Sequence, residues 1–208
     1  VKGTITYFDG KITVDNLTAR HQDGVTLGTK GSGVFTSDRG WEFVLSGLWA
    51  DGIKGQSTLV NALPEKLRLL IDSLHPSGTF SFHGSELAFR QTASAIAPLE
   101  TTWDLQMECH QTNLRCGIDV EGVTGSVRLK GRSNQLESFS SGELDLESVW
   151  YQGIQLTNVK GPMWVNESRC LFGKWATEQT KEPERRLTGN VYGGTMVSNA
   201  WVQFVHSA

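Results

Sequence analysis

The sequence predicts a mainly β protein, an antiparallel sheet of repeated strand modules with one short α-helix near residues 64–74. Three features of the sequence indicate this fold class. Apolar and polar residues alternate along many short segments, turns that contain glycine separate those segments, and blocks of sequence recur at fixed spacings. The 208 residues are 38% hydrophobic and 20% charged, which suits an ordered chain with enough apolar material for a core or a lined surface.

The clearest alternating segment is 102–110. Its apolar residues are Trp103, Leu105, Met107 and Cys109, and the polar residues between and after them are Asp104, Gln106, Glu108 and His110. Because successive side chains of a strand point to opposite faces, this segment predicts a half-buried strand. Similar alternation recurs over 41–45, 79–83, 126–130 and 143–147. It is typical of antiparallel sheets with one apolar and one hydrated face.

The repeated blocks occur on two scales. Ile12–Thr18 resembles Ile154–Lys160 at an offset of 142 residues, and Leu45–Val60 resembles Leu187–Val202 at the same offset. On the shorter scale, Gly117–Gly125 matches the nine residues that begin at Gly153, at an offset of 36. These matches favour duplication of a β-unit, although chance resemblance between strands punctuated by glycine is the alternative.

The order of elements predicts two β-modules with a helix between them. Residues 1–60 are expected to end one module, 61–78 to form a helical insertion, and 79–208 to form the second module, all in one continuous sheet. Pro64 suits the first turn of the helix, and apolar residues recur at helical spacing up to Leu74, which gives the helix one apolar face. The polar segment 177–184 is predicted to be a loop between strands.

Composition and motifs exclude several classes of function. The formal net charge of −3 argues against a nucleic-acid partner, because such proteins normally carry a basic face. No apolar run reaches the roughly 20 residues of a membrane helix. The chain begins at Val1, so we expect it to be a segment of a longer polypeptide.

No constellation of residues indicates catalysis or metal binding. The five histidines have no His-x-x-x-His partner, and neither Cys-x-x-Cys nor Gly-x-Ser-x-Gly occurs. Asp145 and Glu147 form a carboxylate pair, but strand alternation already explains their spacing. We therefore expect a non-enzyme without catalytic residues, metal or cofactor. Cys109, Cys116 and Cys170 are expected to be buried free thiols, with a hairpin pairing of the first two as the alternative.

Two segments carry a family resemblance. Leu144–Gly161 contains Tyr-Gln-Gly-Ile-x-Leu-x-Asn-Val-x-Gly, and Leu187–Met196 contains Gly-x-Val-Tyr-Gly-Gly-Thr. Together they resemble the AsmA-like proteins of the bacterial envelope, which are similar to bridge-like lipid transfer proteins. The resemblance implies an elongated, curved antiparallel sheet, a β-groove lined with apolar side chains. It implies no catalytic residues.

This resemblance also implies a location and a function. The parent protein is expected to be anchored in the inner membrane by a segment outside this one and to reach into the periplasm. Its partners would be phospholipid acyl chains and adjoining β-modules of the same chain, not nucleic acid. Strand alternation assigns the lipid-groove candidates, which are Trp103, Leu105, Met107, Val127, Leu129, Leu144 and Leu146.

Two other functions fit the same pattern. One is a structural or scaffold module that affects the assembly of outer-membrane proteins. The other is a carbohydrate-binding β-sandwich, which would also be rich in tryptophan and in turns that contain glycine. The seven tryptophans of the chain do not decide between these alternatives, because tryptophan fills a core as readily as it lines a groove.

Overall fold

The chain folds as one long antiparallel sheet, which confirms the predicted mainly β fold class. The computed structural model describes residues 1–21, 24–37, 39–54, 68, 75–92, 98–115, 118–134 and 136–204. Its strands are β1 (Lys2–Phe8), β2 (Lys11–Arg20), β3 (Thr26–Phe35), β4 (Trp41–Lys54), β5 (Ser77–Gln91), β6 (Glu100–Arg115), β7 (Asp119–Ser133), β8 (Ser138–Tyr151), β9 (Ile154–Asn166), β10 (Arg169–Phe172), β11 (Leu187–Val191), β12 (Gly194–Ser198) and β13 (Ala200–Gln203).

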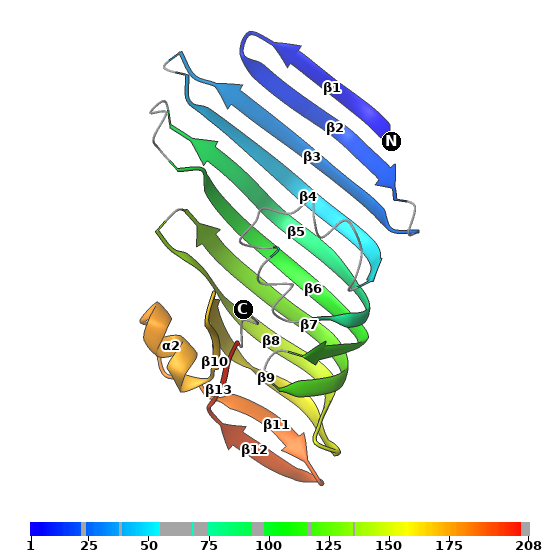
Figure 1. Cartoon of the computed structure of the whole chain (residues 1–208), viewed down its shortest axis with the longest axis vertical. Coiled ribbons are helices and arrows are strands. Elements are labelled where there is room, and N and C mark those ends of the chain that lie inside the picture. Colours follow the sequence, from blue (N-terminus) through cyan, green and yellow to red (C-terminus); the bar gives the residue numbers. More distant parts are fainter. Residues whose placement is uncertain are drawn as a thin grey trace.

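Neighbouring strands in the sequence are neighbours in the sheet as far as β10. The order then continues from β10 to β13, while β11 pairs with β9 and with β12. Figure 1 shows an elongated sheet that twists along its length and curls at the end that holds β7 to β13. The predicted modules 1–60 and 79–208 belong to one sheet, because β4 and β5 pair directly. Apart from Arg68, the helix predicted near 64–74 lies outside the described residues.

Two-residue turns with positive φ at both positions join three of the hairpins. Asp9-Gly10, Gln152-Gly153 and Tyr192-Gly193 connect β1 to β2, β8 to β9 and β11 to β12, and all six residues have φ between 47° and 79°. Positive φ at both turn positions defines the type I′ turn, whose twist matches that of the flanking strands. Glycine at the second position adopts this conformation without steric cost, so these turns fix the register of their hairpins.

The repeated sequence blocks share backbone conformation. The 36-residue offset matches Gly122 (φ 59°) with Asn158 (φ 49°), and it matches Gly125 (φ 125°) with Gly161 (φ 154°). At the 142-residue offset, Asn16 (φ 47°) corresponds to Asn158. These residues lie at or beside positions where the pairing between neighbouring strands is interrupted. The repeated sequence block therefore corresponds to a strand with a bulge. Bulges bend strands and increase their twist, and their recurrence accounts for the curved sheet.

Apolar side chains gather on one face of the sheet. The largest cluster contains Cys109, Val123, Val127, Leu146, Val149, Val159, Met163, Val165, Cys170, Leu187, Val202 and Phe204, all at the curled end. Large side chains also cover glycines of neighbouring strands. A Cβ on Gly131 would lie 2.5 Å from the Trp103 ring, and one on Gly84 would lie 2.7 Å from Leu105. Glycine at these positions therefore lets wide side chains lie across the adjoining strand.

A short helix, α2 (Lys174–Thr180), packs against β9 and β10. The prediction of a loop over 177–184 is wrong for its first four residues. Ala176 and Thr177 are each 1% exposed, and the Asn199 side chain accepts a hydrogen bond from the Lys174 backbone N–H (2.8 Å). Because this cap comes from a residue 25 positions away and the helix has only seven residues, its local sequence contains little helical signal.

The conformation of Asn158 provides a test of the bulges. Asn158→Val should lower the free energy of unfolding by about 1–2 kcal/mol, because a β-branched residue is strained at positive φ. Asn158→Gly should leave it nearly unchanged, since glycine adopts this φ freely. The matched control is Asn190→Val on β11, an exposed strand position without positive φ, which should change stability by no more than about 0.5 kcal/mol. Urea unfolding followed by tryptophan fluorescence measures all three, and equal stability of the two valine variants would contradict the assignment.

Candidate functional site on the apolar face of the sheet

All seven groove residues predicted from the sequence lie on one face, named here the apolar face. In the ladder β6–β7–β8, Met107 pairs with Val127, which pairs with Leu144. Leu105 pairs with Leu129 in the same way, while Trp103 and Leu146 follow the same alternation. Directly paired residues of neighbouring strands point to the same side of a sheet. The side that bears Asp104, Gln106 and Arg128 is named the polar face.

The seven residues differ in burial. Trp103, Val127 and Leu146 are 5%, 9% and 7% exposed. Trp103 is further fixed because its Nε1 donates a hydrogen bond to Ser140 Oγ (3.0 Å). The other four, Leu105, Met107, Leu129 and Leu144, are half-buried. All four pack against buried clusters, so a ligand on the apolar face would contact only their exposed parts.

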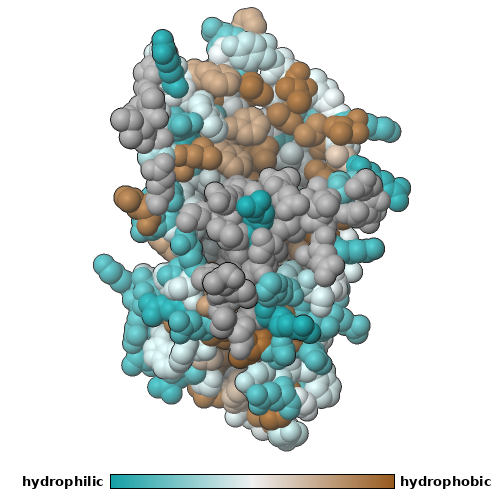
Figure 2. Space-filling model, viewed as in Figure 1, coloured by the Kyte–Doolittle hydropathy of each residue, from teal (hydrophilic) through white to brown (hydrophobic). Residues whose placement is uncertain are grey.

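The apolar face continues beyond the predicted residues toward the N-terminal edge of the sheet. A register row joins Trp103, Leu87, Leu45, Gly31, Val14 and Ile5 from β6 to β1. Leu87 is buried, but Ile5 and Tyr7 on the edge strand β1 are 63% and 66% exposed. Figure 2 shows apolar side chains gathered over β1 to β5 on the viewed face. The face is thus closely packed at the curled end and open to solvent at the β1 edge.

The residues at the β1 end were not among those predicted. Alternation over 41–45 indicated that Phe43 and Leu45 share a face, but it did not indicate which face this was. Bulges in β2 to β4 shift the alternation, so the face of each segment depends on its pairing with the next strand. Pairing is not visible in a single sequence.

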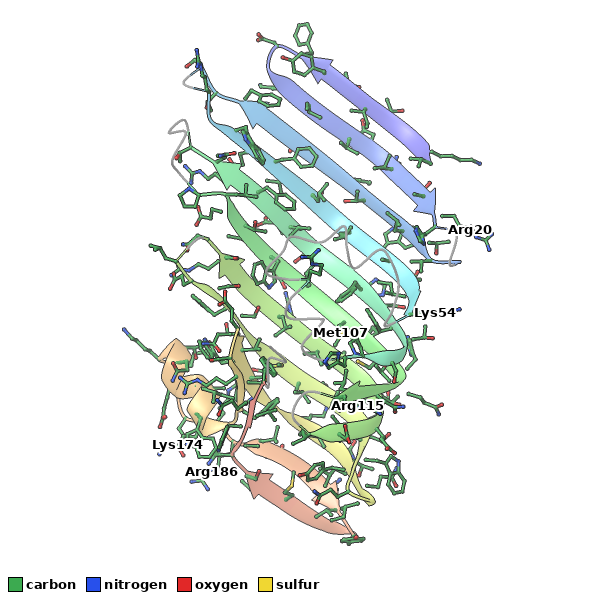
Figure 3. The ribbon with its side chains drawn as sticks, in the orientation of Figure 1. Arg20, Lys54, Met107, Arg115, Lys174 and Arg186 are labelled. Atoms are coloured by element: carbon green, nitrogen blue, oxygen red, sulfur yellow. The ribbon has the colours of Figure 1, made fainter. Side chains whose placement is uncertain are left out.

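Ion pairs cover the polar face. Asp104 accepts hydrogen bonds from Arg128 Nε (3.1 Å) and Nη2 (3.0 Å), and Lys130 Nζ lies 3.1 Å from its Oδ2. The hydrogen bond from Arg128 is the main cause that lowers the pKa of Asp104 to about 2. Asp145, a member of the carboxylate pair noted in the sequence, lies 2.9 Å from Lys160 Nζ. Figure 3 shows how densely side chains cover the ribbon.

The structure describes two of the three cysteines, and both are buried. Cys109 and Cys170 are buried free thiols, as predicted, and Cys116 lies outside the described residues. Burial raises the pKa of Cys109 to about 11, so its thiol is protonated and unreactive at neutral pH.

Among the described residues, no group of three His, Cys, Asp or Glu side chains is placed to hold a metal ion. In the same part of the chain, no helix has the length and apolar character needed to span a bilayer.

Comparisons with protein-family models, curated proteins and solved structures found no match to this chain. The resemblance to AsmA-like proteins remains an expectation from the sequence motifs. The fold argues against the carbohydrate-binding β-sandwich as an architecture. The described residues form one sheet, whereas a sandwich has two packed sheets.

The ion pairs of Asp104 predict a pH dependence of stability. The pKa of Asp104 in the folded state is about 2, below the ordinary 3.8, so the carboxylate stabilises the fold above pH 3.8 and this contribution disappears as pH falls through about 2. Asp104→Asn should therefore lower Tm by about 2–4 °C near neutral pH, and the difference should close on acidification. Asp145→Asn, which removes a more exposed pair, should lower Tm less. Thermal melts followed by circular dichroism measure both variants; a Tm difference for Asp104→Asn that is constant down to about pH 2 would contradict the assigned pKa.

Proposed function

We propose that this chain is a non-enzymatic segment of a periplasmic AsmA-like protein and carries phospholipid acyl chains along its apolar face between the inner and outer membranes. The observation that carries this proposal is the continuity of the apolar face in register from β1 to β9, with exposed apolar side chains at the β1 edge. The parent protein would be anchored in the inner membrane and reach across the periplasm.

The dimensions of the apolar face suit an acyl chain. Strands β1 to β6, the part of the sheet outside the curled end, lie side by side, and a spacing of about 4.8 Å per strand gives a path of about 24 Å across them. One leaflet of a bilayer is about 15 Å of hydrocarbon, half of the full core. The face is thus longer than one chain, so a lipid can occupy successive positions along it. Each methylene removed from water contributes about 0.8 kcal/mol, which provides affinity without polar recognition of the headgroup.

The apolar face is packed more closely at the curled end than near β1, which favours the β1 end for lipid. At the curled end, Val127 and Leu146 already pack against Cys170 and Val202, so acyl chains have no room there without rearrangement. From β6 toward β1, the buried Trp103, Leu87 and Val14 share the face with the exposed Ile5 and Tyr7, so the face opens to solvent toward the β1 edge. Acyl chains would therefore lie across β1 to β6, with headgroups at the hydrated margins of the sheet.

The competing function is a scaffold for outer-membrane protein assembly. In that case another polypeptide module would cover the apolar face, and lipid would have no access to it. The two functions predict different contacts for the same side chains, so a probe on the apolar face separates them.

A crosslinker placed on each face tests the lipid function. Benzoyl-phenylalanine replaces Met107, and the protein is incubated with vesicles of phosphatidylethanolamine and phosphatidylglycerol. On illumination this residue should crosslink to phospholipid. The same residue at Gln106 should crosslink several-fold less, because adjacent strand residues point to opposite faces. Mass spectrometry of the illuminated protein quantifies the lipid adducts. A second pair, Tyr7 and Thr6 on β1, repeats the comparison where the apolar face is most exposed.

Equal crosslinking at both members of each pair would show that lipid meets the sheet without selecting a face, which contradicts the proposal. Absence of lipid adducts at Met107 and Tyr7 would also contradict it and would favour the scaffold. Circular dichroism of each labelled protein establishes that the sheet is intact.

A further inference from the structure

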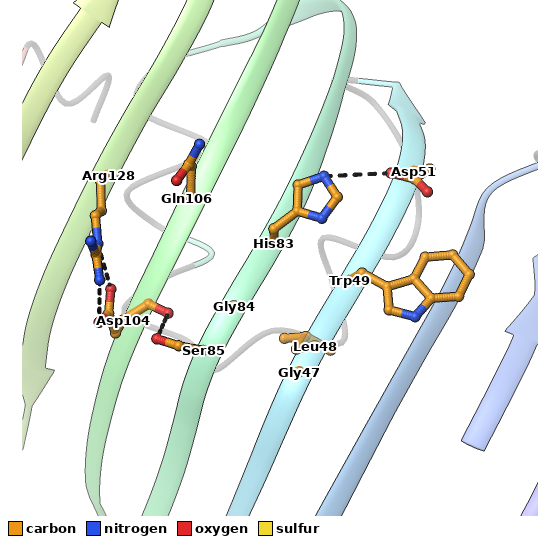
Figure 4. A pocket seen from close by; sticks show the side chains of 10 residues that line it. All are labelled: Gly47, Leu48, Trp49, Asp51, His83, Gly84, Ser85, Asp104, Gln106 and Arg128. Atoms are coloured by element: carbon orange, nitrogen blue, oxygen red, sulfur yellow. Dashed lines mark hydrogen bonds and ion pairs between the residues drawn. The ribbon is translucent and has the colours of Figure 1, made fainter. Parts of the chain in front are cut away.

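Two bulges on neighbouring strands create a hollow on the polar face. Gly47 of β4 (φ 56°) leaves the ladder between Ser46 and Leu48, and Ser85 of β5 leaves it directly opposite, between Gly84 and Glu86. Gly47 carries no side chain, and a Cβ built on it would have no neighbour within 4 Å. The result is an open hollow of about 620 Å³ in the middle of the sheet (Figure 4). This lies within the range of about 300–1,000 Å³ usual for small-molecule sites.

One wall of the hollow is a row of four side chains in register. Trp49 pairs with His83, His83 with Gln106, and Gln106 with Arg128, so the four come from β4, β5, β6 and β7. Figure 4 shows them side by side, with Asp51 near His83 and Asp104 below Arg128. Because neighbouring strands are about 4.8 Å apart, the row presents a polar or aromatic group at regular intervals to an extended ligand.

The aromatic end of the row is held in place. The Trp49 indole lies over Gly28 of β3, where a Cβ would come within 2.5 Å of Nε1. Glycine at position 28 thus permits the ring to rest on the strand backbone. The half-buried ring remains at the rim of the hollow, where it can stack against an apolar ligand surface.

The charged groups that line the hollow are Arg128, Asp104 and Asp51. Arg128 directs two hydrogen bonds to Asp104, so its charge is compensated within the protein. Asp51 and His83 are about half exposed and stand 3.9 Å apart, too far for a good hydrogen bond. Gln106 donates to Glu108 (2.5 Å), which leaves its amide oxygen free to accept. These groups suit a neutral ligand with many hydroxyls.

We propose that this hollow binds a short neutral oligosaccharide. A sugar ring would place its C–H face on Trp49, and the hydroxyls of the following units would hydrogen-bond to Asp51, His83 and Gln106. An anion is disfavoured by the exposed Asp51 carboxylate, and an acyl chain by the polar row. The site lies on the face opposite the proposed lipid groove, so the two activities are independent.

Three trisaccharides serve as probes: maltotriose, cellotriose and tri-N-acetylchitotriose. Titration of the full chain, followed by saturation-transfer difference NMR and by tryptophan fluorescence, should show saturable binding of at least one. Trp49→Ala should weaken that binding about tenfold, the loss expected for one stacking contact. Gln106→Ala should weaken it several-fold. The matched control is Trp201→Ala, because Trp201 is an exposed tryptophan of β13 that does not line this hollow, and it should bind like wild type.

Absence of saturable binding of all three trisaccharides would overturn the proposal. Equal losses in Trp49→Ala and Trp201→Ala would overturn it as well, because binding would then not depend on the hollow. Circular dichroism establishes that Trp49→Ala is folded, and Asp51→Asn, a change at an exposed position, provides a second variant that should weaken binding without unfolding. Lipid crosslinking at Met107 should be unchanged in all these variants, which separates this site from the groove.

Discussion

The two faces of the sheet remain distinct because the bulges of neighbouring strands match. Paired residues therefore continue to point to the same side of the sheet beyond each bulge. A strand that gains a single residue sends all later side chains to the opposite face unless its neighbour compensates. Between β4 and β5 the compensation is direct, since Gly47 and Ser85 leave the ladder opposite each other. Leu45 and Leu48 therefore share the apolar face although they are three residues apart. The apolar face, the curvature and the hollow all depend on this matching of bulges.

Only part of this arrangement was predictable from the sequence. The 102–110 segment alternates without a bulge, so the faces of Leu105, Met107 and Gln106 follow from the sequence alone. The faces of β2 to β4 do not, because their bulges interrupt the alternation at points that pairing determines. Helix α2 was missed because its cap, Asn199, comes from the segment between β12 and β13. The hollow was missed because it is made by the bulges at Gly47 and Ser85, which only the pairing of the strands reveals.

The division into two faces also relates the chemistry of the chain to its proposed function. The directly paired residues of the apolar face in β6 to β8 are Met107 with Val127 and Leu144, and Leu105 with Leu129, so it would select acyl chains by hydrophobicity and not by headgroup. The polar face carries ion pairs such as Asp104 with Arg128, which keep this face hydrated. The buried, protonated Cys109 adds no reactivity. The apolar face is thus buried at the curled end and exposed near β1.

The central claim is that the apolar face holds lipid, and the most direct test is native mass spectrometry of the chain purified from bacterial cells without detergent exchange. The account predicts phospholipid adducts that survive purification and that diminish when Leu45 and Met107 are both replaced by polar residues. Protein that is folded and consistently free of lipid would contradict the claim, and it would indicate that the apolar face is a surface for another protein module.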